Sequence, residues 1–478
     1  MKKNRVLFVK PPDRFLENEF VYQQLGPHYL QSFLELHDIG ADLLVLYESD
    51  DSRQSNKAGS DESPSLEQLN AILIENGGNS VDGAFDKSIF AQYDIVAMSV
   101  MSPQASDAYL LSSFLNQYYP HITTVIGGSH ARYYLPSVST LPDSIAFDFV
   151  VPNDGWWPMY QIAAGEIKRG SAKSQIINHA YKKLVDLPAP TRPKALMDKY
   201  SFNIAGVSAY HTITALGCPF SCHFCESGRE KLRKFSVEMI DHDLEVIAAT
   251  QMALGHKEKA VMFFDDVGLM NPKQVGQLAT LVKKHDFTTW RAFSHAYLIV
   301  KYQDGILAPF NESGGKRIGL GIETGSQKSL NLINKQNGQQ QNVAEHYEAV
   351  RIANESGIAV DAFTMIYPWE DEDDLKATTD LIKFVAANEV KGIDERGRPL
   401  KNHVDSTIMT PFQGTVFFDM INIGELPFVK MKKDMDPGLL YYKGNNGESG
   451  WPYLETRLPK ERYEEVQHYR NSFRPQYR

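Results

Sequence analysis

The run Gly217-Cys218-Pro-Phe-Ser-Cys222-His-Phe-Cys225 directly follows a candidate β-strand, Thr212–Leu216, and contains all 3 cysteines of the 478-residue chain. An odd, clustered set of cysteines cannot form a disulfide framework, so it points to a metal in a reducing compartment. Thiolates suit iron–sulfur clusters, and a 4Fe–4S cubane has one iron more than this run has cysteines. The run therefore predicts a catalytic cluster that is held by Cys218, Cys222 and Cys225, with one iron open to another ligand.

Zinc is the alternative interpretation of the same run. A structural zinc site is usually closed by a fourth Cys or His at short spacing. His223 lies inside the run and would complete a Cys₃His set. We expect the iron–sulfur cluster because an open coordination position is typical of a catalytic metal site.

The cysteine run lies within a series of alternating strands and helices. A helix that begins after Asn271, with Pro272 at its first position, is the clearest of the helices. The candidate strands of this region are Thr212–Leu216, Ala260–Phe264, Thr289–Phe293, Ile318–Ile322, Val360–Ile366 and Val404–Met409. Six βα units predict a partial (β/α)6 barrel of the TIM type rather than a closed eightfold barrel.

The first 150 residues show a second alternating pattern. Helical spacing is expected over Leu25–Leu36 and around Leu110–Leu115, a polar insertion over Ser49–Ser63, and a helix from Ser65. The candidate strands are Val6–Val9, Asp42–Tyr47, Asp94–Val100 and Thr123–Ile126. Short buried strands between helices predict a doubly wound, Rossmann-like α/β domain, which binds ligands in the loops beyond the carboxyl ends of its strands.

These patterns divide the chain into four parts. We expect a Rossmann-like domain over 1–165, a linker over 166–204 that includes Leu187–Pro193, the partial barrel over 205–415 and a small capping region over 416–478. Periodicity fades in the last part. Its aromatic residues are expected to pack against the barrel or to line a pocket: Tyr441, Tyr442, Trp451 and Tyr453.

Composition limits the classes of partner. The formal net charge is −10, from 49 Lys and Arg against 59 Asp and Glu, so we expect no nucleic-acid partner. No apolar run reaches the roughly 18 residues of a membrane span. The apolar run after the basic N-terminus, Val6–Val9, is too short for the core of a secretion signal. We therefore expect a cytoplasmic protein without a membrane partner.

Motifs at the ends of later strands extend the cysteine pattern. The second strand ends in Phe263-Phe-Asp-Asp266, the fourth continues as Gly319-Leu-Gly-Ile-Glu-Thr-Gly-Ser-Gln327, and the fifth as Met365-Ile-Tyr-Pro-Trp-Glu370. The run Leu330–Lys335 follows the second of these motifs. Together with CxxxCxxC, this order resembles the radical S-adenosylmethionine superfamily.

The resemblance implies a cofactor and its contacts. The amino acid end of S-adenosylmethionine would chelate the open iron, and an electron from a donor such as flavodoxin or ferredoxin would lead to a 5′-deoxyadenosyl radical. The residues that the resemblance assigns to cofactor binding are Phe224, Asp265, Asp266, Glu323 and Glu370. The structural alternatives are helix caps for the two aspartates and a satisfied buried carboxylate for Glu323. At position 367 this chain has tyrosine where the family has glycine.

The N-terminal domain shows a second resemblance. The loop Val125-Ile-Gly-Gly-Ser-His-Ala131 ends a strand, and so does Ser99–Gln104. With Lys10-Pro-Pro12 and Gly26–Leu30, they resemble the cobalamin-binding domain that precedes many radical enzymes. The resemblance implies that cobalamin contacts Ser102, Gln104, Gly127, Gly128, Ser129 and His130.

Two features depart from that pattern. The stretch Val151–Trp157 replaces an acidic segment of the family, and His37 lies at the end of the first helix, where we expect it to be a helix C-terminal residue. No lower ligand to cobalt is therefore predicted. A doubly wound domain without cobalamin is the alternative.

Three classes of function follow. The first is a cobalamin-dependent radical methyltransferase that acts on an unactivated carbon of a small molecule or peptide. The second uses the same cofactors for cyclisation, rearrangement or fragmentation. The third is a sensor without catalysis, which the presence of Glu323 and Glu370 disfavours. Enzymes that need a second cysteine-bound cluster are excluded because no cysteines remain. His211 and His295 are expected near the pocket as its wall or as an acid or base.

Overall fold

The computed structural model describes residues 4–13, 18–47, 88–180, 183–335, 342–431 and 454–474. They form two compact units. The first holds the described residues up to Thr191 except Phe20–Gln23, and the second holds Phe20–Gln23 and the described residues from Arg192 onward. The predicted insertion Ser49–Ser63, the predicted helix from Ser65 and the four tail aromatics lie outside the described residues.

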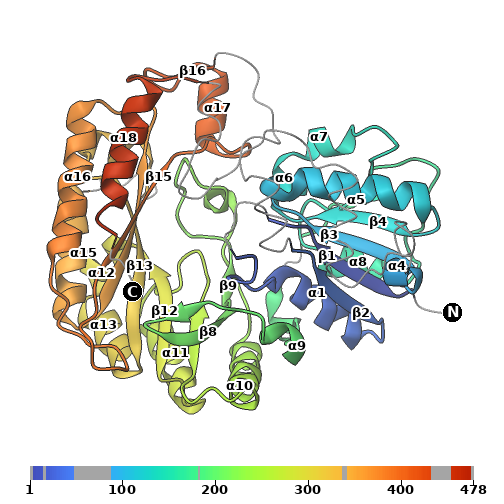
Figure 1. Ribbon diagram of the computed structural model, residues 1–478, viewed down its shortest axis with the longest axis horizontal. Helices are drawn as coiled ribbons and strands as arrows, with labels where there is room; N and C mark the ends of the chain where they lie inside the picture. Colours follow the sequence, from blue (N-terminus) through green and yellow to red (C-terminus); the bar gives the residue numbers. More distant parts are fainter. Residues whose placement is uncertain are drawn as a thin grey trace, which may run out of the picture. The chain divides into compact units, whose positions relative to one another are not determined.

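The first unit is built on a six-stranded parallel sheet in the order β2-β1-β3-β4-β5-β6 (Figure 1). Its strands are β1 Val6–Lys10, β2 Ala41–Val45, β3 Ile95–Ser99, β4 Thr123–Gly127, β5 Phe149–Val150 and β6 Gln175–Ile176. Its helices are α1 Leu25–Leu36, α4 Ser88–Ala91, α5 Ala105–Tyr118, α6 Ser129–Tyr133, α7 Leu135–Ser139 and α8 Trp156–Ala163, with 3-10 turns η1 Ser102–Gln104 and η2 Leu184–Asp186.

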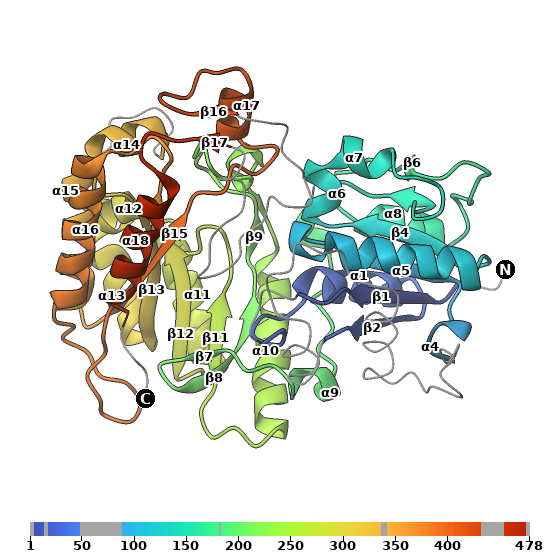
Figure 2. The same cartoon turned by 45° about the horizontal axis from the view of Figure 1, so that its top comes forward.

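Helices cover both faces of this sheet. Helices α1 and α8 pack on one face, where Leu34 and Met159 meet Phe8, Ala97 and other buried side chains. Helix α5 lies on the opposite face (Figures 1 and 2). The observed order confirms the doubly wound fold, and the predicted strands match within two residues at each end.

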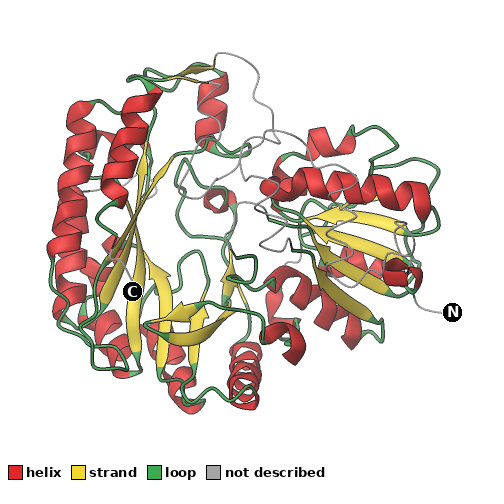
Figure 3. Cartoon of the chain, in the orientation of Figure 1, coloured by secondary structure: helices red, strands yellow, loops and turns green. Residues whose placement is uncertain are grey.

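The second unit is built on a seven-stranded curved sheet in the order β15-β14-β13-β12-β11-β8-β7 (Figure 3). The strands are β7 Asn203–Ile204, β8 Val207–Thr212, β11 Ala260–Phe263, β12 Thr289–Ser294, β13 Gly315–Glu323, β14 Ala359–Ile366 and β15 His403–Ile408. From β8 to β15 the pairs are parallel, and β7 is an antiparallel edge. This open, partial barrel is the predicted fold class.

Helices pack on the outer face of the curved sheet (Figure 1). They are α10 Val237–Ala253, α11 Pro272–Lys284, α12 Ala296–Tyr302, α13 Asp304–Glu312, α15 Val343–Glu355 and α16 Glu372–Ala387, while the short α14 Gln327–Leu332 follows β13 and packs against Tyr367 and Trp369. As predicted, Asn271 caps α11 by accepting a hydrogen bond from the backbone N–H of Gln274 at 3.1 Å. The ring of Trp290 in β12 packs on Phe310 of α13 at 4.4 Å between ring centroids.

The smaller elements of the second unit are α9 Lys194–Met197, β9 Ala215–Leu216, η3 Ser227–Arg229, β10 Arg233–Lys234, α17 Val416–Asn422, β16 Lys430–Met431, β17 Leu454–Glu455 and α18 Lys460–Asn471. Within the described ranges, no helix is both long and apolar enough to cross a membrane.

The first barrel strand was misplaced by the sequence prediction. It spans Val207–Thr212, and the run Thr212–Leu216 leaves the sheet after its first residue. The reason is a carboxylate: Asp265 accepts hydrogen bonds from the backbone N–H groups of Thr214 and Ala215, at 2.7 Å each. These N–H groups are therefore used outside the ladder, and Ala215–Leu216 pairs antiparallel with Arg233–Lys234 instead.

Helix α18 also lies where the sequence shows little periodicity. The helix is mostly charged, yet Tyr463 and Arg470 are fully buried. Arg470 donates from Nε to Thr379 Oγ1 at 3.1 Å and from Nη2 to the carbonyl oxygen of Leu375 at 2.7 Å. A buried arginine in place of an apolar residue hides the helix from a hydrophobic pattern.

A buried ion pair ties several segments of the second unit together. Arg192 and Asp243 have no exposed side-chain surface and meet at 2.8 Å. Asp243 also accepts from Thr212 Oγ1 at 2.6 Å, and Arg192 donates to Gln23 Oε1 at 2.6 Å. The pair therefore links the segment Phe20–Gln23, β8 and α10.

Replacing Asp243 with alanine leaves the buried guanidinium of Arg192 without its carboxylate. We expect the free energy of unfolding to fall by about 3–5 kcal/mol. Urea denaturation of the protein measures this loss. The matched control is Asp380→Ala, which breaks an exposed pair with Lys376 and should cost less than about 1 kcal/mol. Equal losses in the two variants would contradict the prediction.

Candidate functional site

The cysteine loop follows β9. Cys218, Cys222 and Cys225 are free thiols and partly buried. Burial raises the pKa of Cys218 to about 11 and the pKa of Cys222 to about 12, and the thiols raise each other's pKa further because they lie close together. Within the described ranges, no three His, Cys, Asp or Glu side chains converge as the ligands of one metal ion would.

Two features shape the entrance to this loop. Gly217 has φ of +81°, and a Cβ atom there would lie 2.6 Å from the carbonyl oxygen of Lys231, so the position requires glycine. The side chain of His223 contacts the backbone, with Nδ1 at 2.9 Å from the carbonyl oxygen of Leu332. The backbone N–H of His223 also donates to the carbonyl oxygen of Ile333 at 2.9 Å. The loop is thus held against the segment that follows Glu323.

Asp265 holds the chain just before the cysteines. Its Oδ1 accepts from Thr214 Oγ1 at 2.9 Å in addition to the two backbone N–H groups. Its Oδ2 is buried and has no hydrogen-bond partner among the described residues. Burial raises the pKa of Asp265 to about 6. Asp265 is therefore not a helix cap, and Asp266, which accepts from Ser227 Oγ at 3.1 Å, is not one either.

Glu323 lies at a bulge. The register between β13 and β14 shifts between Gly321 and Glu323, and Glu323 has φ of +64°. Its Oε1 meets Nζ of Lys335 at 2.7 Å, and both side chains are buried. Although burial opposes it, the carboxylate raises the pKa of Lys335 above its usual value. A Cβ atom at Gly321 would lie 2.5 Å from Glu323 Oε1, so glycine makes room for the pair.

Lys335 is a residue that sequence reasoning missed as part of the site. It ends the run Leu330–Lys335, which was recognised as similar to the family but not assigned a role. Its Nζ also lies 5.9 Å from the ring centroid of Phe224, so it links Phe224 and Glu323. The available signal was a lysine placed 12 residues after Glu323, shortly after the end of α14.

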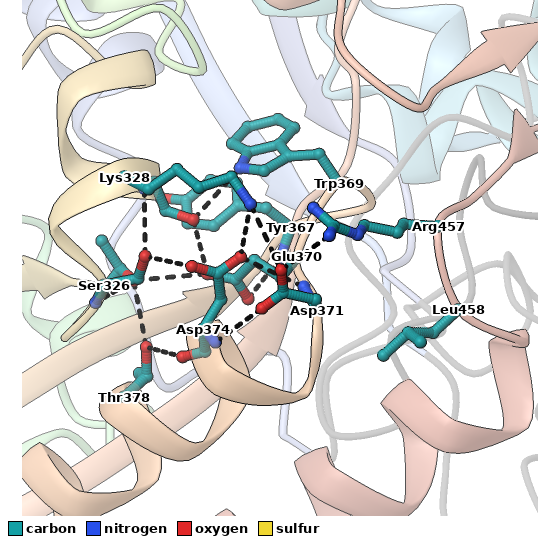
Figure 4. Close-up of polar contacts among 12 residues, drawn as sticks. Ser326, Lys328, Tyr367, Trp369, Glu370, Asp371, Asp374, Thr378, Arg457 and Leu458 are labelled. Carbon is teal, nitrogen blue, oxygen red and sulfur yellow. Dashed lines mark hydrogen bonds and ion pairs between the residues drawn. The ribbon is translucent and has the colours of Figure 1, made fainter.

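Glu370 is fully buried at the end of the β14 segment (Figure 4). Its Oε1 accepts from Ser329 Oγ at 2.9 Å, and its Oε2 accepts from the backbone N–H of Tyr367 at 3.2 Å. Burial raises the pKa of Glu370 to about 7. From α18, the hydroxyl of Tyr463 donates to the carbonyl oxygen of Glu370 at 2.8 Å, so this helix supports the segment.

Tyr367 fills the space beside Glu370. Its ring stacks on Trp369 at 4.7 Å between centroids, and both rings are fully buried. The hydroxyl of Tyr367 has no hydrogen-bond partner among the described residues. A buried hydroxyl without a partner costs about 1–3 kcal/mol.

A charged network on the outer side fixes the loop that carries these residues (Figure 4). Ser326 donates to Asp374 at 2.5 Å, and Lys328 meets Asp374 at 3.0 Å. Asp371 caps α16 and pairs with Arg457 at 2.8 Å. The loop after Glu323 is therefore tied to α16 and to the chain before α18.

The predicted residues of the first unit lie together beyond the carboxyl ends of β3 and β4. His130 is buried, with Nε2 at 2.7 Å from the hydroxyl of Tyr109 and Nδ1 at 3.1 Å from Ser102 Oγ. Burial lowers the pKa of His130 to about 4. Gln104 accepts from the backbone N–H of Met101 at 3.0 Å, while its Nε2 is buried without a partner among the described residues.

Gly127, Gly128 and Ser129 form the turn between β4 and α6. Gly128 has φ of +87°, and a Cβ atom there would lie 2.7 Å from both the nitrogen and the oxygen of Val100. The two loops are joined by hydrogen bonds from Val100 N–H to Gly127 and from His130 N–H to Val100, each 3.0 Å. Elsewhere in this unit, His37 is the C-terminal cap residue of α1, as predicted.

The two histidines that were expected near the pocket, His211 and His295, differ in their hydrogen bonding. His295 caps α12, with Nδ1 accepting from the backbone N–H of Tyr297 at 3.2 Å, and its ring stacks on Phe220 of the cysteine loop at 4.5 Å. His211 lies in β8, is 1% exposed, and has no hydrogen-bond partner at either ring nitrogen among the described residues.

The role of Asp265 in shaping the loop gives a local test. Asp265→Ala removes the acceptor of two backbone N–H groups, so we expect amide hydrogen exchange at Thr214 and Ala215 to become about tenfold faster or more. Exchange measured by mass spectrometry on peptides that cover 212–217 reports this. Asp266→Ala is the control, because among the described residues Asp266 accepts a hydrogen bond only from a side-chain hydroxyl, that of Ser227. Unchanged exchange in Asp265→Ala would contradict the assignment.

Comparison with known proteins adds relatives at the level of sequence. Residues 212–382 match the model of the radical SAM superfamily. An uncharacterized methyltransferase of Pyrococcus horikoshii is 24% identical over 339 residues, which are 67% of this chain and 68% of the relative. The anaerobic magnesium-protoporphyrin IX monomethyl ester cyclase of Rubrivivax gelatinosus is 23% identical over 305 residues, which are 59% of this chain and 52% of the relative.

Solved structures show the same fold. The cobalamin-dependent S-adenosylmethionine radical enzyme OxsB, with aqua-cobalamin and S-adenosylmethionine bound, superposes with a TM-score of 0.68 at 15% identity over 93% of this chain and 65% of OxsB. The radical S-adenosylmethionine methyltransferase TsrM of Kitasatospora setae, with cobalamin and a [4Fe-4S] cluster bound, gives 0.59 at 10% identity over 91% of this chain and 82% of TsrM. The chain thus spans less than two thirds of OxsB and about half of the cyclase. Residues 212–382 form a radical SAM domain, and the described residues share their fold with OxsB and TsrM.

Proposed function

We propose that this chain is a cobalamin-dependent radical SAM methyltransferase that acts on an unactivated carbon of a small-molecule or peptide substrate. The observation that carries the proposal is the loop of three free, partly buried cysteines beside the buried Glu323–Lys335 pair. The relatives named as methyltransferases support the reaction class.

The donor set of the loop fits a 4Fe–4S cluster. Each cysteine of a cubane binds a different iron, and thiolates are the usual ligands. Burial raises the pKa of Cys218 and Cys222, which disfavours the thiolates until a cation binds them. Cys218, Cys222 and Cys225 would therefore hold the cluster, and the ring of Phe224 would help to exclude water from it.

Unpartnered polar atoms fit a polar cofactor at the same site. Asp265 Oδ2 and the hydroxyl of Tyr367 are buried without partners among the described residues. S-adenosylmethionine carries an ammonium group, ribose hydroxyls and an adenine, which supply donors and acceptors for such atoms. Asp265, Asp266 and Glu323 would orient the amino and ribose groups, and Glu370 would hold the Tyr367 backbone in place.

The edge of the first unit fits a bulky ligand. Gly127 and Gly128 present backbone without side chains, and Gln104 Nε2 is a buried donor without a partner among the described residues. Both ring nitrogens of His130 are already hydrogen bonded, to Tyr109 and Ser102. His130, Ser102 and Ser129 would therefore shape a cobalamin site without supplying a ligand to cobalt.

When bound, the cluster with S-adenosylmethionine supplies hydrogen-atom abstraction, and cobalamin supplies a methyl group. The share of the protein is placement and exclusion of water. Asp265 fixes the entrance of the cysteine loop, His223 fastens the loop to the 332–333 backbone, and Lys335 orients the Glu323 carboxyl group through its 2.7 Å contact.

Ring closure or rearrangement with the same cofactors is the second candidate. The cyclase relative from Rubrivivax gelatinosus favours it. The alignment covers 52% of the length of that cyclase.

The test is anaerobic reconstitution with iron, sulfide and hydroxocobalamin, followed by iron and cobalt counts. We expect about four irons per chain, as in a cubane, with one cobalamin retained through gel filtration. Cys222→Ala should lose most of the iron, while the matched control His223→Ala should keep it. Retention of iron without cobalamin would contradict the cobalamin-dependent function, and loss of metal in His223→Ala would favour zinc.

The products of S-adenosylmethionine separate the two candidates. Methyl donation leaves S-adenosylhomocysteine, whereas reductive cleavage leaves 5′-deoxyadenosine and methionine. With a strong reductant, a methyltransferase should yield both 5′-deoxyadenosine and S-adenosylhomocysteine. Formation of 5′-deoxyadenosine alone would favour ring closure or rearrangement.

Tyr367 offers a sharper test of the cofactor site. Tyr367→Phe removes a buried hydroxyl that lacks a partner, so the cofactor-free protein should be as stable as the wild type or up to about 1 kcal/mol more stable. We expect its affinity for S-adenosylmethionine, measured by equilibrium dialysis of the reconstituted protein, to fall about tenfold. Tyr469→Phe, at an exposed position of α18, is the control. Unchanged affinity in Tyr367→Phe would place the hydroxyl outside the cofactor site.

A further inference from the structure

One row of side chains crosses the curved sheet of the second unit. Strand register aligns His211 with Met262, Met262 with Arg291, and Arg291 with Arg317. Residues in register on neighbouring strands point to the same face of a sheet. Trp290 packs on the outer helix α13, so Arg291, its neighbour in β12, points to the inner face. His211 shares that inner face.

Arg291 is only partly used by the protein. Its Nε meets Asp361 Oδ2 at 2.8 Å, and its guanidinium lies 5.1 Å from the ring centroid of Phe293. Its Nη1 has a single long contact, 3.8 Å, to the sulfur of Met262. Nε makes its ion-pair contact with Asp361 without a well-directed hydrogen bond and is buried, and no nitrogen or oxygen among the described residues accepts a hydrogen bond from Nη1 or Nη2. A buried guanidinium normally uses these donors fully.

The charges around Arg291 do not cancel. Asp361 is shared between Arg291 and Arg317, and Arg317 is held further by the carbonyl oxygen of Lys401 at 3.0 Å. Although burial opposes it, the two arginines hold the pKa of Asp361 well below its usual value. Two guanidinium groups therefore face one carboxylate, which leaves one positive charge. The next carboxylate, Asp405, is paired with Arg474.

His211 adds a second unused polar group. It is 1% exposed, and neither ring nitrogen has a partner among the described residues. Its ring is surrounded by Phe202, Phe264 and Tyr22, at 4.6, 5.2 and 5.6 Å between centroids. Burial, followed by the nearby guanidinium groups of Arg192 and Arg291, lowers the pKa of His211 to about 3, so the ring is neutral at pH 7 and one of its nitrogens is a donor.

We propose that the inner face of this sheet binds the anionic end of the substrate, a carboxylate, sulfonate or phosphate, through the free guanidinium donors of Arg291 and the ring of His211. This rests on the proposed function and names a substrate class for it. The aromatic rings beside His211 suit an apolar or aromatic body attached to that anion. Asp361 and Arg317 are positioning residues that hold Arg291 in place.

The test uses two probes of the same shape, naphthalene-1-acetate and the neutral naphthalene-1-acetamide. Each is titrated into the anaerobically reconstituted protein by isothermal calorimetry. We expect the wild type to bind the anion about tenfold tighter or more, since hydrogen bonds to charged groups contribute at least that factor. Arg291→Met should remove the preference, and His211→Phe should reduce it about threefold or more while keeping the ring contacts.

The control is Arg351→Gln, which changes net charge equally at an exposed position of α15 and should keep the preference. If Arg291→Met does not fold, the proposal is judged from the preference for the anion in the wild type and its reduction in His211→Phe. A wild type that binds neither probe or shows no preference for the anion overturns the proposal, and so does a preference that survives in both variants. Iron content and 5′-deoxyadenosine formation, measured on the same wild-type samples, test the proposed function separately, because neither depends on the probes.

Discussion

The candidate site depends first on one carboxylate, that of Asp265. It accepts hydrogen bonds from two consecutive backbone N–H groups and one hydroxyl, and in doing so it draws the chain out of the sheet directly after β8. That departure places Gly217 and the cysteine loop beyond the carboxyl end of the strand rather than within it. Because a buried carboxylate is costly unless it is hydrogen bonded, the loop and Asp265 stabilise one another.

A second constraint acts from the other side of the loop. The bulge at Glu323 re-aims its carboxylate toward Lys335, and the segment up to Lys335 returns to contact the cysteine loop through His223. The same segment is fastened outward through Ser326 to α16, and α16 in turn is braced by Arg470 of α18. Helices α16 and α18, which come late in the sequence, therefore support the segment that carries the Glu323–Lys335 pair.

The fold class could be predicted because buried parallel strands are short apolar runs. The alternation of these runs with helical segments can be followed along the sequence. The exception, the first barrel strand, failed because Thr212–Leu216 is as apolar as Val207–Thr212, and only the side chain of Asp265, 50 residues away, decides between them. Helix α18 escaped prediction because its buried anchor is an arginine. Such choices rest on contacts distant in sequence, which local patterns do not contain.

The candidate site was predictable where motifs are contiguous, as with the cysteines, and less so where partners meet only in space. Lys335 and Glu323 are 12 residues apart and separated by a helix. Arg291 and His211 lie on strands that are not consecutive neighbours, and nothing in either local sequence marks them as sharing a face. That their hydrogen-bonding groups lack partners among the described residues can be recognised only from the three-dimensional structure.

The junction at Gly128 bears on the speed of ligand binding. Because the loops after β3 and β4 are joined by two backbone hydrogen bonds, and any side chain at position 128 would collide with Val100, this edge has its final shape before a ligand arrives. A preformed surface loses little conformational entropy on association. Binding at this edge is then limited by encounter and orientation rather than by loop rearrangement, so its progress follows a single exponential whose rate rises linearly with ligand concentration.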